Sequence, residues 1–112
     1  AAVRAAQPPA ISPATTPAIS PAPASATLAR EVELVDLAMA ALHHGDPRAA
    51  LRTVATHGAE TAGRGQLAED AAAIEVEALC QLREPAAAGK LDAFDRRFPH
   101  SAQRARLTAA CR

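Results

Sequence analysis

The chain lacks tryptophan and tyrosine and has only two phenylalanines, so aromatic side chains can contribute little to a core or to a ligand platform. Proteins that bind nucleic acid carry a basic surface and often stack bases on aromatic side chains. Here 12 basic residues are balanced by 12 acidic ones, and the formal net charge is zero. The composition therefore argues against a nucleic-acid partner.

Long hydrophobic runs are also missing. No stretch approaches the run of apolar residues that a membrane-spanning helix needs. The hydrophobic share of 49% is inflated by 32 alanines, so large core-forming side chains are scarce. With 112 residues the chain has the length of one small domain. We therefore expect any membrane attachment to come only from a transmembrane helix upstream of this sequence.

The composition changes near residue 27. Residues 1–27 contain six of the nine prolines and a single charge, Arg4, and they repeat the motif PAISP at 9–13 and 17–21. Proline donates no backbone hydrogen bond and restricts the preceding residue to extended conformations. Such a segment cannot bury enough apolar surface to offset its ordering entropy. We predict a flexible Pro/Ala-rich linker over 1–27, with a ligand for a proline-reading domain as the alternative, and a folded domain over 28–112.

The spacing of apolar residues in the domain predicts helices, and no run shows the period of two that is typical of a strand. One row, spaced 4, 3, 4 and 3, is expected to form one apolar face of the first helix: Leu28, Val32, Val35, Met39 and Leu42. A second row widens this apolar face, so we expect the helix to pack on two sides: Leu34, Leu37, Ala38 and Ala41. Gly45 and Asp46-Pro47 indicate where this helix ends and the next begins.

Four further helices are expected. The second runs from about Pro47 to His57, and a glycine-containing loop separates it from the third, which begins near Leu67. The fourth lies between Pro85 and Pro99, with Phe94 on its inner face, and Ser101 caps the fifth. Since the turns are short, neighbouring helices should be antiparallel. The sequence thus predicts an all-α stack of helical hairpins with about five helices.

This pattern resembles tetratricopeptide-type repeats, which are antiparallel helix pairs of about 34 residues. Matching positions in the first pair include Leu34, Leu37, Ala38, Ala41, Ala50 and Val54; those in the second include Ala71, Ile74, Ala78, Ala87, Leu91, Phe94 and Pro99. The ending LDAFDRRFPHSAQRARLTAAC is similar to repeats of bacterial periplasmic proteins, among them outer-membrane assembly lipoproteins. Residues 28–112 also resemble periplasmic C-terminal domains of membrane-anchored bacterial regulators.

The resemblance implies a non-catalytic protein–protein interaction module on the periplasmic side of a bacterial membrane, as a monomer or weak homodimer. A protein or peptide partner would lie in a groove along the first helices of each pair. We expect five residues to line this groove: Leu34, Ala38, Ala41, Glu75 and Gln81. Two alternatives stay open: a structural or self-association cap with no dedicated ligand, and a cytoplasmic scaffold.

The two cysteines, Cys80 and Cys111, fall on the third and fifth helices. In a hairpin stack the first, third and fifth helices are neighbours in one layer, so the two thiols can approach. Free cysteines acting as small buried hydrophobes are the alternative. We predict a disulfide, which favours an extracytoplasmic location over a cytoplasmic one with reduced thiols.

Other candidate sites are weak. A zinc site needs three or four convergent ligands, and the adjacent His43 and His44 point about 100° apart on a helix. We expect these two and His57 at helix C-termini, and no metal site. Glu75 and Glu77 point to different sides of a helix, and no strained strand-to-helix turn presents a nucleophile. The sequence therefore predicts no enzyme activity and no cofactor.

Four basic residues cluster around Pro99: Arg96, Arg97, Arg104 and Arg106. One interpretation is a docking patch for lipid head groups or an acidic partner. The other, which we favour, is a solvated helix end whose charges are balanced by Asp92 and Asp95.

Overall fold

A computed structural model describes the backbone of residues 23–112 and the side chains of residues 28–112, and this part of the chain is all-α, as predicted. It consists of five helices: α1 (Pro23–His43), α2 (Pro47–Thr61), α3 (Ala68–Gln81), α4 (Ala87–Arg97) and α5 (Arg104–Ala110). The flexible linker predicted for residues 1–27 lies outside the described residues up to position 22.

Two helix boundaries differ from the predicted ones. Helix α1 begins at Pro23, ahead of the expected boundary at 28, because proline is well tolerated in a first turn and no other proline follows in this helix. Helix α2 continues past His57 to Thr61, and it ends where Ala62 takes a left-handed conformation with φ 55°. His57 is therefore an interior residue of α2, and its predicted place at a helix C-terminus is wrong.

The start of α2 follows the expected local chemistry, but the start of α5 does not. The Asp46 side chain accepts a hydrogen bond of 3.1 Å from the backbone N–H of Ala49, and Pro47 occupies the first turn of α2. Ser101 was expected to cap the fifth helix directly, but α5 begins three residues later. The Ser101 hydroxyl instead accepts from the N–H of Gln103 at 3.1 Å and donates to Glu69 at 2.5 Å, which ties the turn before α5 to α3.

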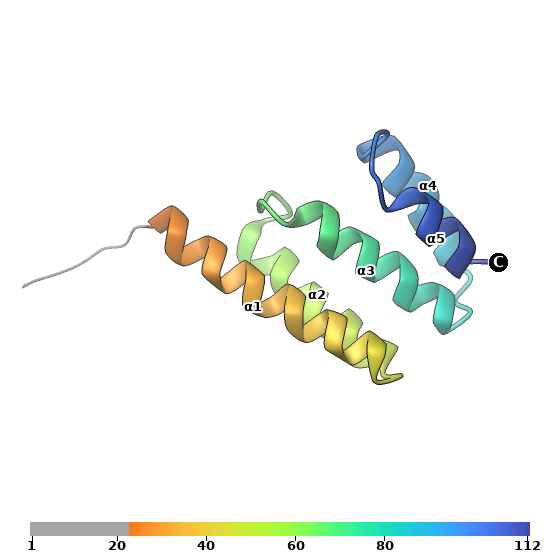
Figure 1. The fold of residues 1–112 in the computed structure, drawn as a ribbon, viewed down its shortest axis with the longest axis horizontal. Coiled ribbons are helices and arrows are strands. Elements are labelled where there is room, and N and C mark those ends of the chain that lie inside the picture. The colour runs from red at the N-terminus through yellow and green to blue at the C-terminus, as the bar shows by residue number, and fades with distance from the viewer. Residues whose placement is uncertain (1–22) are drawn as a thin grey trace, which may run out of the picture.

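Helix α3 is the centre of the stack (Figure 1). It contacts each of the other four helices, with α1 and α5 beside it in one layer. Helices α2 and α4 pack behind this layer and flank α3 without approaching each other closely.

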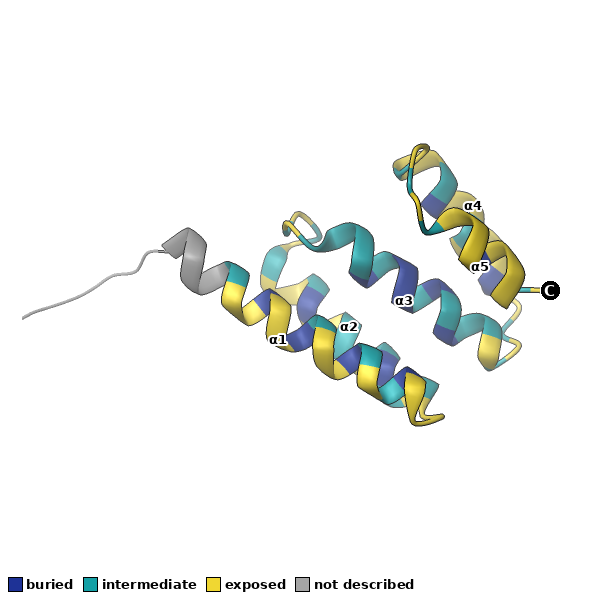
Figure 2. Cartoon of the chain, viewed as in Figure 1, coloured by how far each residue is buried: buried dark blue, intermediate teal, exposed yellow. Residues whose placement is uncertain are grey.

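The core consists of two clusters on opposite sides of α3 (Figure 2). The α1–α2–α3 cluster contains Ala38, Leu42, Ala50, Ile74 and Ala78. The α3–α4–α5 cluster contains Ala73, Val76, Phe94 and Leu107. Phe94 is only 3% exposed, which confirms the predicted orientation of the fourth helix.

The orientation of α1 differs from the prediction that both of its apolar rows pack, because each row has an exposed member, Val32 or Leu37. Its core row, spaced 3, 4 and 4, is Glu31, Leu34, Ala38 and Leu42, all buried. Of the first predicted row, only Leu42 is buried, while Val35 and Met39 are partly buried and Val32 is 43% exposed. Because the core row contains the carboxylate of Glu31, hydrophobic spacing alone does not identify it and indicates neighbouring, fully apolar rows instead.

Candidate functional site

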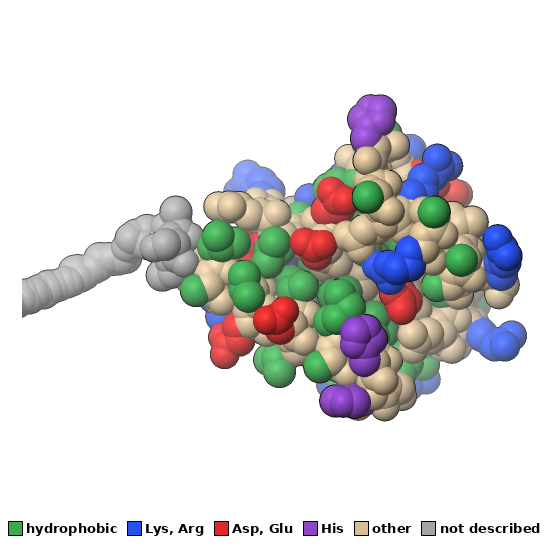
Figure 3. Space-filling view, viewed as in Figure 1, with side chains coloured by type: hydrophobic (Ala, Val, Ile, Leu, Met, Phe, Trp, Pro, Cys, Tyr) green, Lys and Arg blue, Asp and Glu red, His purple; other side chains and the backbone are tan. Residues whose placement is uncertain are grey.

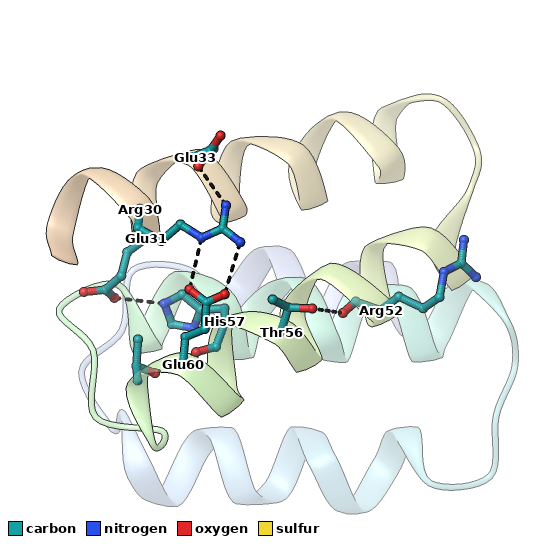
Figure 4. Close-up of polar contacts among 8 residues, drawn as sticks. Arg30, Glu31, Glu33, Arg52, Thr56, His57 and Glu60 are labelled. Carbon is teal, nitrogen blue, oxygen red and sulfur yellow. Dashed lines mark hydrogen bonds and ion pairs between the residues drawn. The ribbon is translucent and has the colours of Figure 1, made fainter. Parts of the chain in front are cut away.

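A buried pair of titratable side chains joins α1, α2 and the loop before α3 (Figure 4). Glu31 and His57 are each 2% exposed, and His57 Nε2 lies 2.8 Å from Glu31 Oε1. The backbone N–H of Leu67 donates to Glu31 Oε1 at 3.0 Å, and that of Gln66 donates to Oε2 at 3.2 Å. A buried carboxylate is costly unless it is hydrogen-bonded, and this one accepts three hydrogen bonds.

These hydrogen bonds determine the charge state of Glu31. Burial by itself raises the pKa of the carboxyl, but the hydrogen bonds from Leu67, His57 and Gln66 outweigh burial and leave the pKa below its ordinary value. An ionised carboxylate can only accept, so His57 Nε2 carries the shared proton. The pair is closed to a substrate by its burial, and we interpret it as a structural link between three segments.

Gly65 makes room for this pair. A Cβ atom at Gly65 would lie 2.7 Å from Glu31 Cδ and 2.9 Å from Thr61 Cγ2, both too close for a side chain. Apolar spacing in the sequence does not predict this pair. Its only signal was that His57 follows Ala50 and Val54 at helical spacing, which places it on the inward face of α2.

A surface ion pair next to the buried one shows how α1 is oriented. Arg30 Nε lies 3.0 Å from Glu60 of α2, and Arg30 Nη1 lies 2.8 Å from Glu33 (Figure 4). The Arg30 guanidinium lowers the pKa of Glu60 through this hydrogen bond. The flank of α1 that carries Arg30 therefore faces α2.

The opposite flank of α1 faces the layer that contains α3 and α5. About 160° of helical rotation separates Arg30 from Val32, and the partly buried Val35 and Met39 pack against the α1–α2–α3 cluster. Leu28, Val32, Val35 and Met39 thus form an apolar row along this flank. Leu37, which is 56% exposed, lies on the Arg30 side.

We call the surface made by these three helices the α1/α3/α5 face. From their positions around each helix, we assign to it Leu28, Val32, Val35, Asp36 and Met39 of α1, Asp70, Glu77 and Gln81 of α3, and Gln103 and Arg106 of α5. The Asp70 carboxylate accepts a 3.0 Å hydrogen bond from Gln103, and Glu77 pairs with Arg106. Figure 3 shows hydrophobic and acidic side chains interspersed over α1 and α3, with most visible Lys and Arg side chains toward α4 and α5.

The structure does not bring the five predicted groove residues together. Leu34 and Ala38 are 5% and 0% exposed in the core, and Ala41 packs partly buried against the same cluster. Gln81 is exposed on the α1/α3/α5 face, whereas Glu75 lies behind α3. The rotation of α1, set by the inward position of Glu31, accounts for Leu34, Ala38 and Ala41. Glu75 and Gln81 are separated because they lie six residues apart on α3, which places them about 120° apart around that helix.

Glu75 lines a shallow groove across the back of α3. A cavity of about 230 Å³ between α2 and α3 and one of about 150 Å³ between α3 and α4 share Ala72, Glu75 and Arg97. Glu75 lies 3.6 Å from Lys90 Nζ, and Arg97 Nη2 donates to the Gly63 carbonyl at 2.6 Å. The charged groups of this groove therefore already have partners within the domain.

Cys80 and Cys111 form the predicted disulfide, with a Cα–Cα distance of 5.0 Å. The bond joins the end of α3 to the residue after α5. Both cysteines are partly buried beside the α3–α4–α5 cluster, which Leu107 covers from α5.

The basic cluster around Pro99 is largely paired. Arg104 Nε lies 3.0 Å from Asp95 Oδ1, Arg106 pairs with Glu77, and the Arg97 guanidinium lies 4.9 Å from the centre of the Phe98 ring. Asp95 is thus one of the balancing acids, as expected. These contacts favour the interpretation as a solvated helix end over a docking patch.

Within residues 23–112, no group of three or more His, Cys, Asp or Glu side chains is placed to hold a metal ion. The helices of this described part are too short or too polar to cross a bilayer. No protein-family model matches the chain, and no curated protein or solved structure is significantly similar to it. Its function must therefore be inferred from its own surface.

Proposed function

We propose that this domain is a non-catalytic protein-interaction module, similar to a short tetratricopeptide-type stack, which binds a protein or peptide on the α1/α3/α5 face. The observation that carries the proposal is the apolar row on α1. Val32 is 43% exposed in a chain with few large apolar residues, and the adjacent Val35 and Met39 continue into the core. A partner packed on this row would extend an existing core rather than cover an isolated side chain.

The disulfide supports an extracytoplasmic setting for this module. Disulfides persist in oxidising compartments and are rare in the cytosol. We therefore propose that the domain works on the periplasmic side of a bacterial membrane, attached through a segment upstream of Ala1. Two alkylatable thiols in protein isolated from its native cells would instead favour the cytoplasmic scaffold.

Site-specific photo-crosslinking in the native cells tests the proposed binding face. A photoreactive residue at position 32 should give a covalent adduct with another protein. The same residue at position 37 is a matched control, because Leu37 is even more exposed but lies on the other flank. Adducts from both positions, or from neither, would contradict the proposal. An adduct with a second copy of this chain would instead favour the self-association cap.

A further inference from the structure

The α1/α3/α5 face combines an apolar row with an acidic border, and this combination specifies the chemistry of a partner. The inference rests on the proposed function. Leu28, Val32, Val35 and Met39 are spaced 4, 3 and 4 along α1, so the row extends about 16 Å. A partner helix with apolar residues at the same spacing could lie along it, as in other helix-in-groove complexes.

Acidic side chains border this row. Asp36 lies four residues after Val32 and three before Met39, which places it on the same flank. Across the face, α3 contributes Asp70 and Glu77. The border is therefore acidic on both helices.

Basic side chains do little to neutralise this border. Arg30, the only Lys or Arg of α1, is held on the opposite flank by Glu60 and Glu33. On α5, Arg106 pairs with Glu77 and also donates to Gln103, so this one cation stands against three carboxylates of the face. Asp36 and Asp70 are left to give the face its negative charge.

We propose that the occupant of this face is a basic amphipathic α-helix, with Lys or Arg residues beside an apolar stripe. The stripe would pack on Val32 and Met39 while its basic residues approach Asp36 and Asp70. Charge complementarity also argues against two other occupants. An anionic lipid surface would be repelled, and two copies of the face would oppose like charges.

Fluorescence anisotropy with two labelled synthetic helices tests this partner chemistry on the full, oxidised chain. Both probes carry the same leucine stripe, and they differ only in having lysine or glutamate beside it. We expect the lysine probe to bind at least tenfold more tightly than the glutamate probe, with an affinity that falls as salt is raised. Asp36→Lys should weaken the lysine probe and strengthen the glutamate probe.

A matched pair of variants locates the site. Val32→Ser should weaken the lysine probe about tenfold, the effect of losing one buried valine contact, whereas Leu37→Ser should leave binding unchanged. Both positions are exposed, so the variants should keep the parent's helical circular dichroism spectrum.

Equal binding of both probes, or preference for glutamate, would overturn the basic partner. If Val32→Ser still weakened such binding, the proposed interaction face would stand. If neither probe binds at about 1 mM, the proposal of a helical partner is wrong. The proposed protein-interaction function is tested separately, by crosslinking from position 32. If the chain forms concentration-dependent dimers that Val32→Ser abolishes, the proposal of a basic helix is also wrong, and the occupant of the face is a second copy of this chain.

Discussion

Replacing Glu31 by alanine should be among the most destabilising changes in this domain, although Glu31 is charged and lies on the first helix. The substitution removes the acceptor for three hydrogen bonds, from His57 Nε2 and from the N–H groups of Leu67 and Gln66. An unsatisfied buried donor costs about 1–3 kcal/mol, and a water entering the vacated polar space would recover part of the loss. We expect a loss of about 3–5 kcal/mol, a large share of the total stability of a small domain.

Urea denaturation followed by circular dichroism at pH 7, with the disulfide intact, measures this loss. Glu33→Ala is the control, because the Glu33 side chain is 60% exposed and bonds only to Arg30 among the described residues. It should change the free energy of unfolding by less than about 0.5 kcal/mol. A loss below about 1 kcal/mol in Glu31→Ala would refute the reasoning, since it would mean that the buried His57 and the two partly buried N–H groups do not depend on the Glu31 carboxylate.

Glu31→Gln removes the negative charge of this side chain but nearly keeps its shape, so it measures the contribution of the charge to stability. The pKa of Glu31 is lowered in the folded protein, so its ionised form contributes stability that is fully present above the unfolded pKa. This contribution is lost as the pH falls through the folded pKa, which lies below the ordinary value of a glutamate. The parent should therefore exceed Glu31→Gln in stability at pH 7, and the difference should shrink on acidification. A difference that stays constant down to about pH 2 would show that the charge of Glu31 contributes nothing.

Three further outcomes are expected. Phe94→Ala should cost about 3–5 kcal/mol in the same denaturation assay, because its ring is 3% exposed in the α3–α4–α5 cluster. Reducing the Cys80–Cys111 bond should cost about 2–4 kcal/mol and raise hydrogen exchange chiefly in 101–112; a uniform rise would contradict a local role. Gly65→Ala should lower the melting temperature, whereas Gly89→Ala, which meets no neighbour on an exposed helix, should raise it slightly; equal effects would disprove the steric role of Gly65.

Local signals in the sequence were sufficient for most of the fold. Asp46-Pro47 predicts the start of α2 because a cap and a first-turn proline act within one turn. The apolar spacing through Phe94 predicts the inner face of α4, because that helix is apolar on one side only. The disulfide followed from the layer order of a hairpin stack, which places Cys80 near Cys111.

The rotation of α1 about its own axis could not be predicted from such local signals. Two neighbouring rows of this helix are apolar, and the decision between them depends on Glu31, which spacing rules assign to solvent. Its burial depends on donors 26 to 36 residues away, His57, Gln66 and Leu67, and on the space left by Gly65. The prediction of the groove was wrong for the same reason, because the hydrogen bonds of Glu31 orient α1 so that Leu34 and Ala38 point into the core.

The order of helix contacts has a kinetic consequence. Among the described helices, each contacts only helices that are one or two places away along the chain. The tertiary contacts therefore join segments that are close in sequence. Such local topologies fold quickly, in microseconds to milliseconds for small helical domains. In a quasi-linear stack, stability is roughly the sum of successive interfaces, so one end can open while the other stays closed. The α1–α2–α3 end, closed by Glu31, and the α5 end, closed by its covalent bond, can therefore respond separately to acid and to a reductant.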